Sequence, residues 1–268
     1  MKKLALVRRP SPRLAEGLLT HIERVPVDFQ LAQRQWQDYV DALHACGWQT
    51  VEVPPAPDCP DSVFIEDTMV VYRDTALISR PGADERKPEV VDAEATVAKL
   101  GYRIERVQAP GTLDGGDVLK VGDTIYVGHT PRTNLEGIAQ LRATFEPLGA
   151  TVVTVPVTAV LHLKSAVTAL PDGTIVGWEP AVDDTTVFPR FLAMPEESGA
   201  HVVLLGDEAM ARLWDRHDAV SRELALLHRG REVDRSDGFL MLFDQPGDAA
   251  EFACDYHRRL GLLPVPAA

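Results

Sequence analysis

Three carboxylates stand close together just ahead of a predicted strand. They are Asp61, Glu66 and Asp67, and the last two have apolar residues on both sides. The residues from Phe64 onward have the composition of a strand, in which successive side chains point to opposite faces, so at least one carboxylate is expected to face inward. A buried carboxylate needs a cation or hydrogen-bond donors. The cluster therefore indicates a site for a cationic group, although a solvated loop could carry the same residues.

Other segments carry residues that could complete such a site. Asp114 and Asp117 flank two glycines, which allow the backbone to approach a ligand closely. Arg132 follows a predicted strand and could hold a carboxylate through its planar guanidinium, and His162 lies between two leucines at a strand edge. Taken singly, these residues fit an ordinary turn, a surface arginine and a core histidine. Because they fall at strand ends of successive repeats, together they predict one central site with a carboxylate–histidine acid–base pair.

The composition restricts what this site can bind. The 268-residue chain has 40 acidic and 27 basic residues and a net charge of −13, which repels phosphate backbones and anionic membranes and attracts cations. We therefore expect a small cationic ligand, no nucleic acid and no membrane. The first apolar run is too short for a signal peptide, and no later run has the length of a membrane span, so a soluble, cytoplasmic protein is expected.

Cysteine usage and motif spacing give no sign of a metal or an organic cofactor. The three cysteines, Cys46, Cys59 and Cys254, are widely spaced and form neither a disulfide framework nor a metal-binding pair. The sequence also has no clustered metal-ligand spacing, no glycine-rich phosphate loop and no nucleophile elbow of the hydrolase type. These patterns therefore point to neither a metal nor a cofactor.

A repeated unit of about 50 residues positions these groups. An apolar strand follows each of four glycines: Gly47, Gly101, Gly149 and Gly199. The first three glycines end segments of helical periodicity (29–46, 87–100 and 135–148), where a positive φ is needed. Hairpins with polar turns are predicted over 69–80, 117–128 and 166–178. The sequence thus predicts an α/β fold, a pseudo-symmetric propeller of strand–strand–helix–strand units with four units recognisable.

The repeat stops near Gly206. Residues 207–262 predict a helix, a hairpin around Ser236 and a second helix, which is not the order of the repeat. We therefore divide the chain into propeller units over 1–206, an α+β segment over 207–262 and a tail over 263–268. The fifth propeller unit is then replaced or missing.

The motifs together resemble one known family over about residues 3–206. They are Asp61 with Phe-Ile-Glu-Asp at 64–67, Ser79-Arg-Pro-Gly-Ala running to Arg86, Leu-Asp-Gly-Gly-Asp at 113–117, Arg132-Thr-Asn134, and His162-Leu-Lys-Ser165. In this order and at these intervals they resemble dimethylarginine dimethylaminohydrolase. The resemblance implies the five-bladed α/β propeller of the guanidine-modifying (pentein) superfamily. It also implies hydrolysis of Nω-methylated arginine to citrulline and a methylamine, without metal or organic cofactor.

The resemblance implies substrate-binding roles for Leu18, Asp61, Glu66, Asp67, Arg86 and Arg132. The first two would line the site, the next two would hold the guanidinium and α-amino ends, and the two arginines would bind the α-carboxylate. His162 would be the general acid and base, oriented by Asp114. A cysteine thiolate would attack the guanidinium carbon, dimethylamine would leave with a proton from the histidine, and water would hydrolyse the thiouronium.

One position departs from the family pattern. The family's nucleophile is a cysteine near the C-terminus, and its nearest counterpart here is Leu242, at the end of a segment that begins at Asp237. Leucine is not a nucleophile, so the nucleophile is not identified. Cys254, which shares a helix face with His257, is a remote candidate. Residues 207–262 instead resemble part of a class III nucleotidyl cyclase domain, with Asp237 as the single matched metal position.

The sequence therefore leaves two functions open. The first is an amidine hydrolase of this family that is impaired because the thiol is not at its expected place. The alternative is a non-catalytic binder of arginine-like cations, and a cyclase-related role would depend wholly on residues 207–262. Assembly into homo-oligomers is left open.

Overall fold

The structure is a computed structural model that describes residues 3–20, 24–45, 47–195, 200, 220–229, 231–234, 240–242, 245, 248, 251, 252 and 255. The chain divides into two compact units, which we describe separately. The first comprises residues 1–40 and 48–204, and the second comprises 41–47 and 205–268. Within the described residues, no helix combines the length and apolar character needed to cross a membrane.

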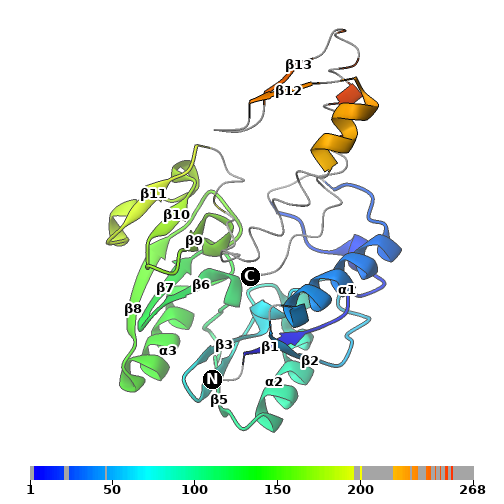
Figure 1. The fold of residues 1–268 in the computed structure, drawn as a ribbon. Coiled ribbons are helices and arrows are strands. Elements are labelled where there is room, and N and C mark those ends of the chain that lie inside the picture. The colour runs from blue at the N-terminus through cyan, green and yellow to red at the C-terminus, as the bar shows by residue number, and fades with distance from the viewer. Residues whose placement is uncertain are drawn as a thin grey trace. The chain divides into compact units, whose positions relative to one another are not determined.

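Two sheets of the first unit share one topology, in which an antiparallel hairpin is followed by a helix and a strand parallel to the hairpin's second strand (Figure 1). The first consists of β3 (Met69–Tyr72), β4 (Thr75–Ile78), α2 (Val90–Lys99) and β5 (Arg103–Arg106). The second consists of β6 (Val118–Val121), β7 (Thr124–His129), α3 (Leu135–Phe145) and β8 (Thr151–Pro156). These units confirm the predicted strand–strand–helix–strand repeat.

The other two sheets of the first unit are variations on this repeat. β1 (Leu4–Val7) and β2 (Gln49–Glu52) form a parallel pair, and α1 (Phe29–Ala45), of which residues 41–45 are assigned to the second unit, lies between them in the sequence. The predicted hairpin after His162 is present as β9 (Val167–Ala169) and β10 (Ile175–Gly177). These four small sheets with their helices fit the predicted pseudo-symmetric α/β propeller with four recognisable units.

The fourth unit differs from its prediction. The strand beside and parallel to β10 is β11 (Phe191–Ala193), and the segment that leads to it contains two short 3-10 turns, Glu179–Ala181 and Thr185–Val187, in place of a helix. Pro180 lies within the first turn, and Asp184 immediately precedes the second. Both residue types favour turns. Gly199 and residues 201–205, where we expected this strand, lie outside the described residues.

Glycine ends each of the three predicted helical segments as expected. Gly47, Gly101 and Gly149 have φ angles of +77°, +90° and +95°, which only glycine adopts without strain. The chain can therefore reverse direction after each helix, and the next strand runs parallel to the strand that precedes the helix. The core around α3 contains Ile125, Leu141 and Phe145, all fully buried, and it fixes β7 and β8 against the helix.

The second unit contains a helical stretch at 220–227 and an antiparallel pair, β12 (Arg231–Asp234) and β13 (Leu240–Leu242). Residues 248, 251, 252 and 255 are also helical. This agrees with the expected order of helix, hairpin and helix. The hairpin turn at 235–239 and the predicted boundary near Gly206 lie outside the described residues.

Asn134 offers a direct test of how α3 is held at its N-terminus. Its Oδ1 accepts hydrogen bonds from the Gly137 and Thr112 amides at 2.8 and 2.9 Å, so it caps the helix and ties it to the preceding loop. We predict that Asn134→Ala lowers the free energy of unfolding by about 1–2 kcal/mol in urea denaturation. Asn134→Asp keeps both acceptor contacts and should lose less. Equal losses for the two variants would contradict the capping role.

Candidate active site

One cavity of about 840 Å³ in the first unit collects most of the predicted site residues. Its lining includes Leu18, Asp61, Glu66, Asp67, Arg86, Arg132 and His162. Asp114 is fully buried beneath this surface. Segments far apart in the sequence therefore meet at one place, as the distribution of polar residues over the repeats predicted.

The acidic cluster lies on a 3-10 turn, Ile65–Thr68, and not on a strand as predicted; β3 begins only at Met69. Because a 3-10 turn has three residues per turn, adjacent side chains diverge without pointing to strictly opposite faces. Glu66 points outward, is largely exposed and pairs with Lys164 at 2.5 Å. Asp67 points inward and is 6% exposed. One inward carboxylate was correctly predicted, but its backbone conformation was wrong.

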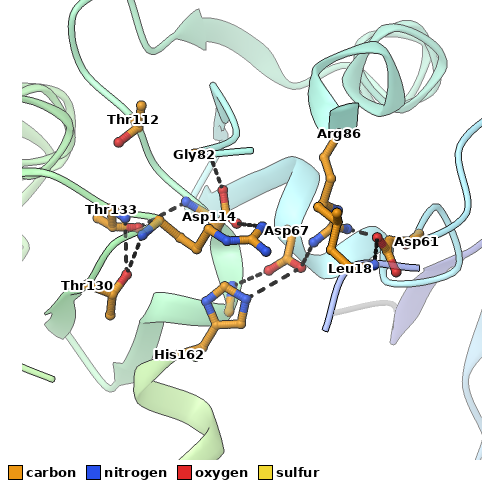
Figure 2. A network of polar contacts seen from close by, with 12 residues as sticks. Leu18, Asp61, Asp67, Gly82, Arg86, Thr112, Asp114, Thr130, Thr133 and His162 are labelled. Atoms are coloured by element: carbon orange, nitrogen blue, oxygen red, sulfur yellow. Dashed lines mark hydrogen bonds and ion pairs between the residues drawn. The ribbon is translucent and has the colours of Figure 1, made fainter. Parts of the chain in front are cut away.

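Arg86 holds Asp67 in place within the protein interior (Figure 2). Its Nη1 donates to Asp67 Oδ2 at 2.6 Å, and its Nε and Nη2 donate to the buried carboxylate of Glu89 at 2.8–3.2 Å. Burial alone would raise the pKa of Asp67, but the charges of Arg86 and His162 and the hydrogen bonds from Arg86 and Gly116 together outweigh burial and hold that pKa below its usual value.

The predicted contact of Arg86 with a substrate α-carboxylate stays a prediction, and the contacts of Arg86 in this structure do not favour it. Its guanidinium already binds two carboxylates and also donates to the carbonyls of Asp61 and Phe64. A third carboxylate would have to compete with two buried ones. In this structure the contact of Arg86 with the cavity runs through Asp67.

Asp61 presents a buried negative charge to the cavity. Its Oδ2 accepts a hydrogen bond from the Leu18 amide at 3.0 Å, and the residue is 8% exposed. No cation of the described residues lies within ion-pair distance of it. A carboxylate buried with a single amide donor is suited to a cationic group brought by a ligand.

Arg132 and Asp114 form a second buried pair on another side of the site. Arg132 Nη1 lies 3.6 Å from Asp114 Oδ2, and Asp114 Oδ1 accepts from the Gly82 amide at 2.9 Å. Burial and the charge of Asp67 raise the pKa of Asp114 to about 6, although the Gly82 amide opposes this shift. Arg132 Nη1 has no hydrogen-bond partner among the described residues and remains suited to an anionic group.

His162 lies between two carboxylates. Its Nε2 faces Asp67 Oδ2 at 4.0 Å, and its Nδ1 lies 3.3 Å from Asp117 Oδ1. Burial disfavours the charged imidazole, but the nearby carboxylates, with Asp117 foremost, outweigh burial and raise the pKa of His162 above its usual value. The predicted partner of His162 was Asp114, and this stays a prediction; among the described residues, the carboxylate that lies nearest a ring nitrogen belongs to Asp117. The sequence singled out Asp117 only as part of the glycine turn.

Gly116 allows this close assembly. Its amide donates to Asp67 Oδ1 at 2.6 Å, and a Cβ atom at this position would lie 2.8 Å from both Asp67 Oδ1 and the His162 ring. The glycine thus lets the backbone approach other side chains closely, while the predicted close approach to a ligand stays a prediction. The group approached is the acidic side chain of another repeat.

Asp67, Asp114 and His162 also have donor atoms within 4.8 Å of one another, which is compatible with a metal ion. Arg86 and Arg132 already stand against the two carboxylates, so the charge balance favours a single cationic group over a divalent metal. The absence of a metal remains a prediction from the sequence.

The described residues place no nucleophilic thiol in the cavity. Cys59 is a buried free thiol that does not line the cavity, and burial raises its pKa. Leu242 lies in β13 of the second unit. Cys46, Cys254 and Asp237 lie outside the described residues. Among the described residues, no cysteine lines the cavity.

Comparison with known proteins places this fold among α/β propellers of guanidine-modifying proteins. Two solved structures of dimethylarginine dimethylaminohydrolase superpose well. A cysteine-to-serine variant from Pseudomonas aeruginosa with citrulline has a TM-score of 0.70 at 34% identity and covers 75% of this chain and 79% of that one. A histidine-to-glycine variant joined to S-methyl-L-thiocitrulline has a TM-score of 0.69 at 33% identity, with the same coverage.

Sequence comparison narrows this class to one family. The N(G),N(G)-dimethylarginine dimethylaminohydrolase of Streptomyces coelicolor is 67% identical over 204 residues, which cover 76% of this chain and 79% of that protein. The chain therefore belongs to the dimethylarginine dimethylaminohydrolase family, a family of hydrolases. A scan against protein-family models found no match. The comparisons do not show the predicted nucleotidyl cyclase resemblance of residues 207–262.

The raised pKa of Asp114 leads to a pH-dependent stability prediction. A carboxyl group with a raised native pKa supports folding below its unfolded pKa, and that support is lost as the pH rises through about 6. Asp114→Asn, which cannot ionise, should therefore gain stability relative to the parent between about pH 4 and pH 7. The expected gain is about 2–3 kcal/mol. Urea denaturation of both proteins across this range measures it, and a constant difference would contradict the prediction.

Proposed function

We propose that the cavity binds the guanidinium group of Nω-methylated arginine, the substrate class of the family. The observation that carries this proposal is Asp61, a buried carboxylate in the cavity wall with no cationic partner among the described residues. Asp67 supplies a second carboxylate that stays ionised beside it. A planar cation with several N–H donors satisfies such a pair better than a compact ammonium does.

We further propose roles for the remaining residues of the cavity. Arg132, whose Nη1 has no hydrogen-bond partner among the described residues, binds the α-carboxylate, and Leu18 forms part of the wall. Glu66 stands at the exposed edge, where it and Lys164 can exchange their mutual contact for contacts with the amino-acid end. The raised pKa of His162 favours an imidazolium near neutral pH, the form that can protonate a departing methylamine.

In the family's reaction, a thiolate attacks the guanidinium carbon and the C–N bond to dimethylamine breaks as that amine takes a proton. Water then adds to the carbon, the C–S bond breaks and citrulline is released. The chain offers Leu242 where the thiol is expected, and no described cysteine lines the cavity. We therefore propose an amidine hydrolase of this family whose turnover is impaired. The alternative, a non-catalytic binder of arginine-like cations, is favoured by the same observation.

The charge of the chain also bears on which molecules the protein binds. A net charge of −13 suits a small cationic substrate and disfavours nucleic acid and anionic membranes. We propose a cytoplasmic protein that needs neither metal nor organic cofactor. Homo-oligomers are compatible with this function but are not required by it.

We predict that the purified chain binds asymmetric dimethylarginine but forms little citrulline. Binding depends on the carboxylates and Arg132, whereas turnover also needs a thiol at the guanidinium carbon. Titration calorimetry measures the first and a citrulline assay the second. Rapid turnover that a thiol-blocking reagent abolishes would overturn the impairment, and Cys254→Ser and Cys59→Ser would then locate the nucleophile.

A second prediction separates binding from chemistry. Asp61→Asn keeps an acceptor for the Leu18 amide but removes the charge, so it should weaken dimethylarginine binding by roughly 1.5–3 kcal/mol. His162→Ala should change the affinity much less, because His162 acts mainly on proton transfer. Glu136→Gln removes a charge from the exposed surface of α3 and serves as the control. If Asp61→Asn binds as tightly as this control, the proposed guanidinium site is wrong.

A further inference from the structure

We propose that Lys164 is a specificity-determining residue of this cavity, which restricts cationic ligands to those that also carry a carboxylate. This role rests on the proposed function, because Glu66 is taken there as a contact for the amino-acid end of the ligand. Lys164 is not among the positions to which the family resemblance gives a substrate-binding role. It acts because its ammonium group and that of the ligand compete for one carboxylate.

Lys164 is fixed at its backbone and carries a flexible ammonium group. It lies on the 3-10 turn Leu163–Ser165, where Leu163 is fully buried and its amide donates to Asp117 Oδ1 at 3.1 Å. The side chain of Lys164 is 24% exposed, and its Nζ lies 2.5 Å from Glu66 Oε1. Both residues line the cavity. The ion pair therefore joins segments of two repeats at the cavity wall.

A second lysine adds positive charge to the same part of the wall. Lys120 lines the cavity from β6, and its Nζ donates to the Val71 carbonyl at 2.7 Å. Partial burial of its ammonium group lowers the pKa of Lys120, and the charge of Lys164 lowers it further, whereas the charge of Glu66 opposes the shift. The two ammonium groups are thus close enough to repel each other, and Glu66 is close enough to attract both.

This charge balance disfavours a ligand that brings only a cation. Among the described residues, Glu66 is the carboxylate within ion-pair distance of Lys164. A ligand ammonium that binds Glu66 therefore displaces Lys164, which then lacks an anion and faces the charges of the ligand and of Lys120. An unpaired charge of this kind is a common way for a site to reject the wrong ligand.

A ligand that is an α-amino acid removes this penalty. Its ammonium and carboxylate groups are bonded to one carbon atom, so an ammonium group that reaches Glu66 brings a carboxylate to the neighbourhood of Lys164. The lysine ammonium can follow because it is carried on a flexible four-carbon stem. Lys164 can therefore exchange the carboxylate of Glu66 for that of the ligand.

Arg132 does not make Lys164 redundant. A carboxylate has two oxygens and can accept hydrogen bonds from both side chains. Arg132 is buried and stands beside Asp114, so its contact with a ligand leaves the pair of Glu66 and Lys164 unchanged. Arg132 therefore contributes affinity for a carboxylate, whereas Lys164 adds a penalty when the carboxylate is absent.

The test compares two ligands that differ only in the carboxylate: asymmetric dimethylarginine, and the amine in which hydrogen replaces that group. Titration calorimetry measures the affinity of the full chain for each, and the parent should prefer the amino acid. In Lys164→Met, Glu66 is free and the amine should bind more tightly, so the preference should fall by about three- to tenfold. Lys164→Arg keeps the charge and should keep most of the preference.

Two controls separate competition for Glu66 from a general change of charge. Lys120→Met removes the same charge from the same wall, but Lys120 is held by a backbone carbonyl, so the preference should change by about twofold or less. In a Glu66→Gln background no carboxylate can be freed, so Lys164→Met should no longer raise the affinity for the amine. An equal fall in preference in Lys120→Met, or a gain that persists with Glu66→Gln, would overturn the proposal.

The outcomes also distinguish this role from the proposed function. A parent chain that binds neither ligand would refute the proposed function, and the specificity with it. A parent that binds both ligands, with its preference unchanged in Lys164→Met, would refute only the role of Lys164. Circular dichroism shows whether each variant is folded, and Lys164→Gln, which also removes the charge, takes the place of Lys164→Met if that variant is not.

Discussion

The buried ion pair between Arg86 and Asp67 is the interaction on which the rest of the site depends. A carboxylate that is 6% exposed stays charged only because a guanidinium lies 2.6 Å away and an amide donates to its other oxygen. Glu89 fixes the far side of that guanidinium, so Arg86 cannot turn toward a ligand. The result is a stationary negative charge beside Asp61 and opposite His162. Cation binding and the proton affinity of His162 both follow from this charge.

This arrangement separates recognition from reaction. Every described group that could recognise a methylated arginine belongs to the repeated units of the first compact unit, where the relatives with 33–34% identity have the same fold. The predicted counterpart of the nucleophile, Leu242, lies in the second unit, on a strand paired only with its hairpin neighbour among the described residues. A binding site can therefore be retained while the bond-breaking group is not. For this reason we treat affinity and turnover as independent properties of the chain.

Much of the fold could be predicted from local pattern. The hairpins at 69–80, 117–128 and 166–178 and the glycines that end the helical segments follow from alternation, helical periodicity and the need for positive φ. The strand at 191–193 was missed because it is short, and its polar and proline-rich approach lacks the periodicity that marked the other repeats. Of the residues that meet in the cavity, the acidic cluster, Arg132 and His162 were also identified from their places next to repeated strands, whereas Leu18 and Arg86 followed only from the family resemblance.

The repeat pattern was enough to group the residues that face one another, because a repeated unit places equivalent strand ends at a common centre. How these residues pair depends on the packing of the folded chain. Asp67 turns inward and Glu66 outward because the chain adopts a 3-10 turn. Arg86 binds Asp67 and Glu89, and His162 lies against Asp117, which is 45 residues earlier in the sequence. Periodicity describes one segment at a time. Which of two aspartates, three residues apart, lies nearer His162 depends on distances that are set by packing between segments.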